Sequence, residues 1–495
     1  LANAVTVGDS ASTDLSVAQA GLLNGIPNYD HKGGYDIVDT ADAVSKSSVE
    51  ILGDSDAVSL SNVATAAQGA LINGLDKGQS TTNITFTVND TAANLAANAA
   101  NLDVANAVSV GGSASTELSV ANAVLVNGIP NYDHKGGYTI KDSASKVSNS
   151  TVAILGDADS VTVSNVATAA TGALINALDK DQSATNITFS VKDTAANLVT
   201  HAANLDVANS VTVGNSASTE LSVANAGVLN GIPNYDHKGG YTIKDTADAV
   251  SKSSVEILGD SDSVTLSNVA NAAQGALING FDKGQSTTNI TFNVEDSATN
   301  LAANAANLDV ADKVSVGSAG DNEVSVAEAT LLNGIAKYDH LGGYDIKDAP
   351  AAVAASTKEV LGDSDAVVVS TVANASHGAA INSLQSAIDA DQASSQVKTD
   401  ISFSVKDAGA GLNTVLSADK SLSHATKVEL TNDSGGQVLD ITGNISDVSD
   451  TKQAMADFAS LTSAGRSLVL GNILDKSSAA SLDKYSSAMV AIEEL

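Results

Sequence analysis

The feature that most constrains this chain is a repeat of 103 residues. The stretch N-G-I-P-N-Y-D-H-K-G-G-Y begins at Asn24, Asn127 and Asn230, and a divergent copy begins at Asn333. Units that repeat at a fixed period normally bury their apolar faces against neighbouring units, so they stack lengthwise and do not enclose one large core. The sequence therefore indicates a tandem array whose role is to span a distance, to present a surface or to form an assembly.

The period divides the chain into four units and a C-terminal remainder. The residues from Ala2 to Val5 match those from Ala105 to Val108, so we expect a start inside a unit, as in a processed product or a piece of a longer protein. Terminal units need atypical faces to close a stack. The predicted units are 1–103, 104–206, 207–309 and the divergent 310–408, followed by 409–495, a degenerate repeat and cap with a last helix at about 479–492.

Each unit consists of two related halves, marked by a ladder of aspartates. A short strand with alternating apolar residues precedes each aspartate, as in Ile84 to Val88, and an Ala-rich run at helical spacing follows, as in Leu95, Ala99 and Leu102. An aspartate at this position is a good helix N-cap. The predicted helix caps are Asp39, Asp90, Asp142, Asp193, Asp245, Asp296 and Asp348, and Asp407 continues the ladder after a longer step.

Every half reads as strand, helix, strand, helix. Strands joined by helical crossovers usually become parallel neighbours with right-handed connections. We therefore predict an α/β fold, a repetitive right-handed solenoid-like stack of strand–helix coils, each of about 24 to 30 residues. The alternative is an all-β solenoid in which the Ala-rich pieces are turns.

The composition agrees with thin layers of small apolar side chains. Apolar residues make up 43% of the chain and aromatic residues only 3%, so Ala, Val, Leu and Ile must form the core. The sequence contains no cysteine, which excludes disulfides, thiolate metal sites and cysteine nucleophiles.

The formal net charge of −33 limits the classes of partner. Nucleic-acid binding requires a basic footprint, and anionic lipid repels an acidic chain, so neither partner is expected. No apolar run reaches the length of about 20 residues that a membrane-spanning helix needs. The acidity is explained either by solubility and mutual repulsion or by dependence on a divalent cation.

The repeated Tyr/His stretch is the first candidate site. Its glycines suit a tight connection in which tyrosines cover a gap and Asp orients His. The other interpretation is an exposed Tyr row that contacts a ligand or another subunit. No nucleophile stands at a recognisable spacing from His31 and Asp30, so catalysis is not expected. The candidate binding residues are Tyr29, His31, Tyr35, Tyr132, His134, Tyr138, Tyr235, His237, Tyr241, Tyr338, His340 and Tyr344.

The turn G-D-x-D is the second candidate site. Two carboxylates separated by one residue can share a hard cation such as Ca²⁺, which takes several oxygen ligands. A helix-ending turn with solvated acids explains the same pattern. The candidate metal ligands are Asp54, Asp56, Asp157, Asp159, Asp260, Asp262, Asp363 and Asp365.

Two phrases resemble a known group of proteins. D-T-A-A-N-L at Asp90 and Asp193 is followed about 25 residues later by L-S-V-A-x-A at Leu118 and Leu221. The combination resembles the tandem-repeat regions of very long bacterial surface proteins that type I systems secrete, such as adhesins, surface-layer components and extracellular fibres. The resemblance implies an extracellular setting, frequent calcium dependence and no enzymatic role.

We therefore expect an extracellular structural protein, a rod, fibre or surface-layer segment that stacks and associates with like molecules. The alternative is a cell-surface adhesin that presents the repeated Tyr/His edge to a glycan or a protein.

Overall fold

The computed structural model describes most of the first 407 residues and a few beyond them. The described residues are 3–8, 13–79, 82–112, 116–182, 185–214, 219–284, 288–317, 322–392, 398–407, 411, 414, 415, 422, 424–430 and 467–469. The expected helix at 479–492 and most of the predicted cap lie outside them. The chain forms two compact units, 1–242 and 243–495, and strand β14 (Tyr241–Asp245) spans their junction.

The first unit alternates short strands with helices. Its strands are β1 (Asp14–Leu15), β2 (Asp36–Asp39), β3 (Ala57–Leu60), β4 (Asn83–Thr85), β5 (Thr87–Asp90), β6 (Ala107–Val110), β7 (Thr116–Leu118), β8 (Tyr138–Asp142), β9 (Ser160–Val163), β10 (Ile187–Thr188), β11 (Ser190–Asp193), β12 (Ser210–Val213) and β13 (Thr219–Leu221). Its helices are α1 (Val17–Asn24), α2 (Ala41–Ser45), α3 (Val49–Gly53), α4 (Ala66–Lys77), α5 (Ala92–Asn98), α6 (Val120–Asn127), α7 (Ala144–Ser148), α8 (Val152–Gly156), α9 (Ala169–Lys180), α10 (Ala195–His201) and α11 (Val223–Asn230), with 3₁₀ turns η1 (Ala99–Asn101) and η2 (Ala202–Asn204).

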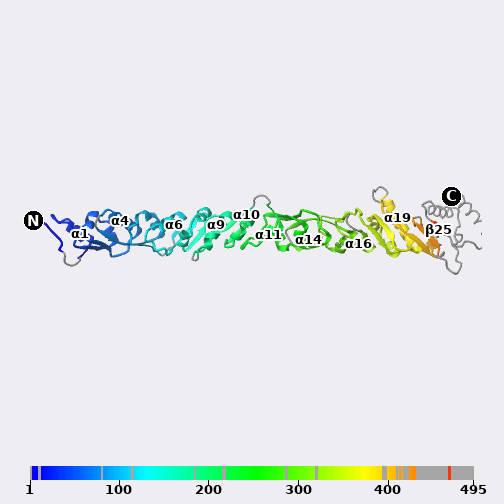
Figure 1. Ribbon diagram of the computed structural model, residues 1–495, viewed down its shortest axis with the longest axis horizontal. Coiled ribbons are helices and arrows are strands. Elements are labelled where there is room, and N and C mark those ends of the chain that lie inside the picture. The colour runs from blue at the N-terminus through cyan, green and yellow to red at the C-terminus, as the bar shows by residue number, and fades with distance from the viewer. Residues whose placement is uncertain are drawn as a thin grey trace, which may run out of the picture. The chain divides into compact units, whose positions relative to one another are not determined.

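Strand pairing in the first unit is parallel and joins strands that are consecutive in the chain. The sheets are β1-β2-β3-β4, β5-β6, β7-β8-β9-β10 and β11-β12. Paired residues are close in sequence: Val88 pairs with Val108, 20 residues later, and Val58 pairs with Ile84, 26 residues later. Helices α1, α4, α6 and α9 likewise follow one another in chain order (Figure 1).

The second unit has the same organisation. Its strands are β15 (Ser263–Leu266), β16 (Asn289–Thr291), β17 (Asn293–Asp296), β18 (Lys313–Val316), β19 (Glu323–Val324), β20 (Asp345–Asp348), β21 (Ala366–Val369), β22 (Asp400–Ser402), β23 (Ser404–Asp407), β24 (Lys427–Leu430) and β25 (Ser467–Val469). Its helices are α12 (Ala247–Ser251), α13 (Val255–Gly259), α14 (Ala272–Gly284), α15 (Ala298–Asn304), α16 (Val326–Asn333), α17 (Pro350–Ala354), α18 (Lys358–Gly362) and α19 (Ala375–Asp391), with the 3₁₀ turn η3 (Ala305–Asn307). Strand β15 pairs in parallel with β16, and the further parallel sheets are β17-β18, β19-β20-β21-β22 and β23-β24-β25.

Helix α19 accounts for most of the longer last step of the aspartate ladder. The equivalent helices α4 and α9 have 12 residues each, whereas α19 has 17. The helix lies between β21 and β22, so its extra residues lengthen the connection between two strands that still pair in parallel.

Small apolar side chains form the core between strands and helices. Val58, Val88, Leu95 and Leu102 are almost completely buried. Helix α4 approaches the sheet through Gly69, where a Cβ atom would lie 2.7 Å from Val88 Cγ2 and 3.0 Å from Leu102 Cδ2. The glycine therefore sets the close helix–sheet spacing of this layer.

The α/β prediction is confirmed, and its parallel sheets alternate with helices as expected. The all-β alternative is wrong, because the Ala-rich runs form helices such as α4 and α5. The division into four 103-residue units stays a prediction.

Candidate functional site

The repeated Tyr/His stretch forms a tight loop with several left-handed residues. We call residues 24–35, 127–138, 230–241 and 333–344 the Tyr–His loops. In the first copy the φ angles of Asn28, His31, Gly33 and Gly34 are 63°, 53°, 76° and 85°. A non-glycine residue in this region costs on the order of 1 kcal/mol, so other contacts must hold His31 there. In the fourth copy Lys337 replaces the asparagine and no longer has a positive φ.

The histidine of the loop binds the first aspartate of the G-D-x-D turn. His31 Nδ1 lies 2.5 Å from Asp54 Oδ2, and the Asn24 amide donates to the same oxygen at 2.6 Å. The second and fourth copies repeat the pair, with 2.6 Å between His134 and Asp157 and between His340 and Asp363. Since a carboxylate only accepts, Nδ1 donates. The imidazole is about half exposed and the carboxylate largely buried.

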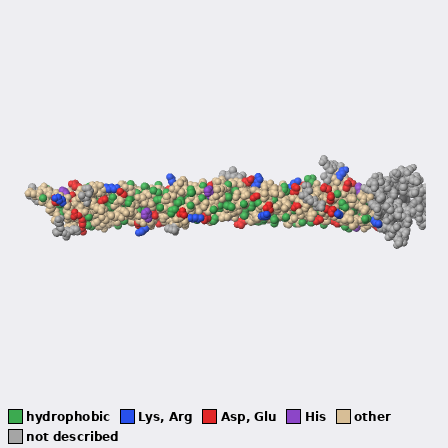
Figure 2. Space-filling model, viewed as in Figure 1, with side chains coloured by type: hydrophobic (Ala, Val, Ile, Leu, Met, Phe, Trp, Pro, Cys, Tyr) green, Lys and Arg blue, Asp and Glu red, His purple; other side chains and the backbone are tan. Residues whose placement is uncertain are grey.

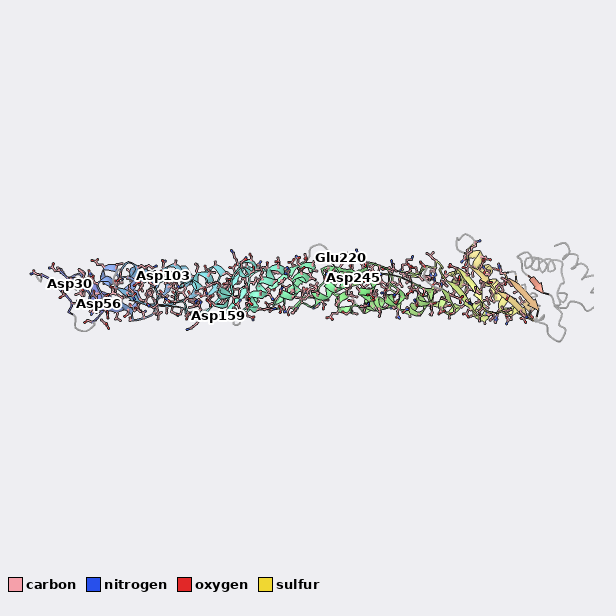
Figure 3. The ribbon with its side chains drawn as sticks, in the orientation of Figure 1. Asp30, Asp56, Asp103, Asp159, Glu220 and Asp245 are labelled. Carbon is pink, nitrogen blue, oxygen red and sulfur yellow. The ribbon has the colours of Figure 1, made fainter. Side chains whose placement is uncertain are left out.

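The second aspartate of the turn binds the backbone of the same loop. Asp56 Oδ2 accepts a hydrogen bond of 3.0 Å from the Gly34 amide, and Asp159 does the same for Gly137. A Cβ atom at Gly33 would lie 2.1 Å from Asp56 Oδ1, so this position requires glycine. Figure 3 labels Asp56 and Asp159, the two copies of this aspartate in the first unit. Sequence reasoning treated loop and turn as separate sites, whereas the structure joins them.

The tyrosines of the loop are buried, which corrects the interpretation of an exposed Tyr row. Tyr29 is 5% exposed and Tyr35 is 1% exposed, and the equivalents Tyr132, Tyr138, Tyr235, Tyr241, Tyr338 and Tyr344 are buried too. The His31 ring lies on the edge of Tyr29, with 4.8 Å between ring centroids, and His237 lies similarly on Tyr235. Tyr29 also bridges in parallel to Val5. At 5% exposure, Tyr29 is part of the core.

Burial controls the ionisation of these tyrosines. It raises the pKa of Tyr132, and the negative charges of Asp157 and Asp133 raise that pKa further. Burial also raises the pKa of Tyr138, to which the nearby Tyr132 and Asp157 add. Tyr132 and Tyr138 are therefore neutral over the ordinary pH range.

The G-D-x-D carboxylates do not fit a shared cation. Asp54 faces His31 and Asn24, while Asp56 faces the Gly34 amide, so the two groups are oriented by separate donors. Asp157, Asp159, Asp363 and Asp365 have the same donors in their own copies, and Asp260 is the C-terminal cap of α13. Among the described residues, no group of three or more His, Asp or Glu side chains is arranged to hold a metal ion.

Contrary to the prediction, the ladder aspartates do not cap the helices that follow them. The next residue in the chain is the N-cap, and the aspartate binds the start of the preceding helix. The N-cap of α5 is Thr91, not Asp90, and the N-cap of α2 is Thr40, not Asp39. Asp90 instead accepts a 2.8 Å hydrogen bond from the amide of Ala66, the first residue of the preceding helix α4. The same contact links Asp39 to Val17, Asp142 to Val120, Asp193 to Ala169, Asp296 to Ala272, Asp348 to Val326 and Asp407 to Ala375, and Asp245 ends strand β14.

Hydrogen bonds lower the pKa of several ladder aspartates. Burial alone would raise the pKa of Asp90, but bonds from the Asn94 side chain and from the amides of Ala66 and Thr91 outweigh it and lower the pKa. The pKa values of Asp193 and Asp296 are also lowered, because equivalent hydrogen bonds outweigh the effect of burial. The ionised carboxylate is therefore the form that suits the folded chain.

Buried asparagines provide a further link that sequence reasoning missed. Asn73, 2% exposed in α4, accepts a 3.0 Å hydrogen bond from the amide of Val104, 31 residues later. Asn176 and Asn279 bind Val207 and Val310 in the same way. The signal in the sequence is an asparagine among buried apolar positions of a helix, recurring at the 103-residue period.

No family model matches the chain, and a search of curated proteins found no match to it. Among the helices in the described part of the chain, none is long and apolar enough to cross a membrane.

Proposed function

We propose that the chain is part of an extracellular structural repeat protein without enzymatic activity. In this proposal its strand–helix segments stack as a right-handed α/β solenoid and give a rod, fibre or surface-layer segment. The observation that carries the proposal is the local pairing of strands: within the first unit, paired residues such as Val88 and Val108 are only 20 to 26 residues apart. Chains built from such local pairings grow lengthwise as segments are added.

Polar contacts between successive segments support the same proposal. Asp90 binds the first amide of α4 from the next segment, and Asn73 of α4 binds the amide of Val104. Each of these buried or half-buried groups has a hydrogen-bond partner in a neighbouring segment, which an isolated segment would lack. Each segment therefore depends on its neighbours for hydrogen bonds as well as for apolar packing.

The extracellular location and the bacterial surface setting derive from the sequence resemblance. They are tested by protease treatment of intact cells that express the full protein, which should digest these repeats without lysis. The adhesin alternative depended on an exposed Tyr/His edge. Because the tyrosines are buried, only the half-exposed imidazoles of the Tyr–His loops remain for a partner, and no contact in the described part of the chain favours that alternative.

Deletion of one whole repeat tests the proposed architecture. Removing residues 104–206 brings equivalent positions together, so the shortened chain should remain folded by circular dichroism. Its particles in electron microscopy should be shorter by a fixed increment, with unchanged width. A control deletion of 104–196 joins positions that are out of register and should unfold the region around the junction.

Two results would contradict the proposal. One is a particle whose width falls instead of its length when 104–206 is removed. The other is equal damage from the in-register and out-of-register deletions, since stacked segments must distinguish them.

A further inference from the structure

Three neighbouring helices in each of the first three copies of the repeat leave an apolar face without a cover. In the first unit, α4 packs against α5 and α5 packs against α6. We define the apolar helical face as Val63 and Leu71 at α4, Ala93 and Ala97 on α5, and Leu125 on α6, all of which are exposed. The side chains of Leu71 and Val63 are 57% and 52% exposed. Patches of this kind on a protein surface mark sites of association.

The apolar helical face is almost free of charge, although the chain carries a net charge of −33. Within α4, α5 and α6 the only charged residues are Asp76 and Lys77 at the end of α4, and Lys77 pairs with Asp103 at 2.6 Å. Helices α2 and α3, by contrast, carry Asp42 and Glu50. Two acidic chains repel one another wherever charged faces meet, so an uncharged face is where they can approach.

The apolar helical face recurs with the period of the chain. Three of its positions carry exposed apolar side chains in successive copies of the repeat. The equivalents of Val63 are Val166, Val269 and Val372, and those of Leu71 are Leu174 and Leu277. The third series is Leu22, Leu125, Val228 and Leu331. Figure 2 shows hydrophobic side chains at many places on the visible surface. A second copy of this chain has the same spacing between its patches, so several patches can engage at one register.

We propose that the apolar helical face is the surface through which two copies of this chain associate side by side. The inference rests on the proposed structural function and names its partner as a second copy. Each patch is small, with at most three of these exposed valine and leucine side chains, so a single contact is weak. Repetition along the chain makes later contacts intramolecular, which raises the overall affinity without new kinds of contact.

The test adds negative charge to the face and, separately, elsewhere. The variant Leu71→Glu with Leu174→Glu places two acids on successive copies of the face. The control variant Ser145→Asp with Ala153→Glu places two acids on α7 and α8, where the equivalent positions Asp42, Asp248, Glu50 and Glu256 are already acidic. Both variants have the same net charge, and all four substituted positions are exposed. Circular dichroism checks that both variants fold.

Sedimentation velocity of the full chain over a range of concentrations gives the association constant. We expect concentration-dependent association of the unsubstituted chain, stronger at higher salt because repulsion is screened. The face variant should associate at least roughly tenfold more weakly, because a charge would be buried without a partner, and the control variant should be within about twofold of the unsubstituted chain.

Equal association of the face variant and the control would overturn the inference, as would an unsubstituted chain that stays monomeric at every concentration. Either result leaves the proposed architecture untouched, because the deletion of residues 104–206 tests particle length in a single molecule. Conversely, the chain could associate through this face while the deletion of residues 104–206 gives a result that contradicts stacking. That outcome would contradict the proposed solenoid and leave the association surface standing.

Discussion

Asp193 accepts a 2.9 Å hydrogen bond from the backbone amide of Ala169, the first residue of helix α9, which precedes it by 24 residues. Thr168, the N-cap of that helix, satisfies a different amide, that of Thr171. Each such helix therefore receives one cap from its own sequence and one from the following segment, and the carboxylate lies near the positive end of the helix dipole.

Removal of the Asp193 carboxylate should loosen both segments that it joins. We expect Asp193→Ala to lower the free energy of unfolding by about 1–2 kcal/mol, the range for loss of a helix cap. The exposed Asp181, at the other end of α9, is the matched control, and Asp181→Ala should change stability by less than about 0.5 kcal/mol. Urea unfolding followed by circular dichroism measures both. Equal effects would show that the bond to Ala169 contributes nothing.

The lowered pKa of Asp90, Asp193 and Asp296 predicts sensitivity to acid. A carboxylate with a folded-state pKa below its unfolded-state value stabilises the fold above the unfolded value, about 3.9, and this contribution is lost as the pH falls through the folded pKa. The melting temperature should therefore be level near neutral pH and fall below about pH 4. Asp193→Asn should reduce the loss of stability at acid pH in the segments around residue 193, measured by hydrogen exchange of their backbone amides. An unchanged dependence of that stability on pH would contradict the assignment of the effect to Asp193.

Two glycines of helix α4 should respond to alanine in opposite directions. Gly69→Ala places a Cβ atom against Val88 and Leu102, so we expect a loss of about 1–3 kcal/mol from overpacking. Gly74 has nothing within 4 Å of its Cβ position, and alanine already occupies the equivalent position 177. Gly74→Ala should therefore stabilise the chain by about 0.5–1 kcal/mol through helix propensity. Thermal melts of both variants, compared in one buffer, decide the signs.

Sequence periodicity was sufficient to predict strands, helices and the α/β class. The alternating run from Ile84 to Val88 is extended as expected, but it is divided between β4 and β5, which belong to different sheets. Leu95 lies in α5 and Leu102 follows η1, and both are buried. The run after Asp39 was harder to interpret, because Ser48 caps a second short helix, α3, where one helix was expected. A capping residue inside an apolar pattern can divide the run into two short helices, while the apolar residues keep the spacing expected for one continuous helix.

The contacts of the candidate site were less predictable, because they join residues from different segments. The sequence shows a constant 23-residue interval from His31 to Asp54 and from His134 to Asp157, but an interval does not say which groups meet. The ladder aspartates illustrate the same limit: the local pattern that suggests an N-cap is compatible with a bond to the preceding helix. The burial of the tyrosines likewise depends on how neighbouring segments cover the loop.

His134 should contribute through both its backbone and its side chain. Its φ of 51° is strained for alanine but not for glycine, and its Nδ1 binds Asp157 at 2.6 Å. We expect His134→Ala to destabilise by about 1–3 kcal/mol, with strain and the lost bond combined, and His134→Gly to recover on the order of 1 kcal/mol of that loss. His134→Asn, which tolerates this φ and retains a donor, should be the mildest of the three.

The order of these variants in a melting experiment separates the two contributions. If alanine and glycine are equally harmful, the loop stores no backbone strain at His134. If asparagine is as harmful as alanine, the bond to Asp157 needs an imidazole.

The buried tyrosines predict an abrupt alkaline transition. Burial and nearby carboxylates raise the pKa of Tyr132 and Tyr138 above the ordinary value near 10, so the folded chain favours neutral phenol. A group with a raised folded-state pKa gives stability that is complete below the unfolded value and is lost as the pH rises through the folded pKa. Tyrosinate absorbance at high pH should therefore lag behind that of a urea-unfolded sample above about pH 10 and then rise together with the loss of helical signal. Eight of the nine tyrosines lie in the Tyr–His loops, so nearly the whole absorbance change should be delayed. Superimposable titration curves for folded and unfolded chains would show that solvent reaches these hydroxyls, and would contradict the packing of the loop against its neighbouring segments.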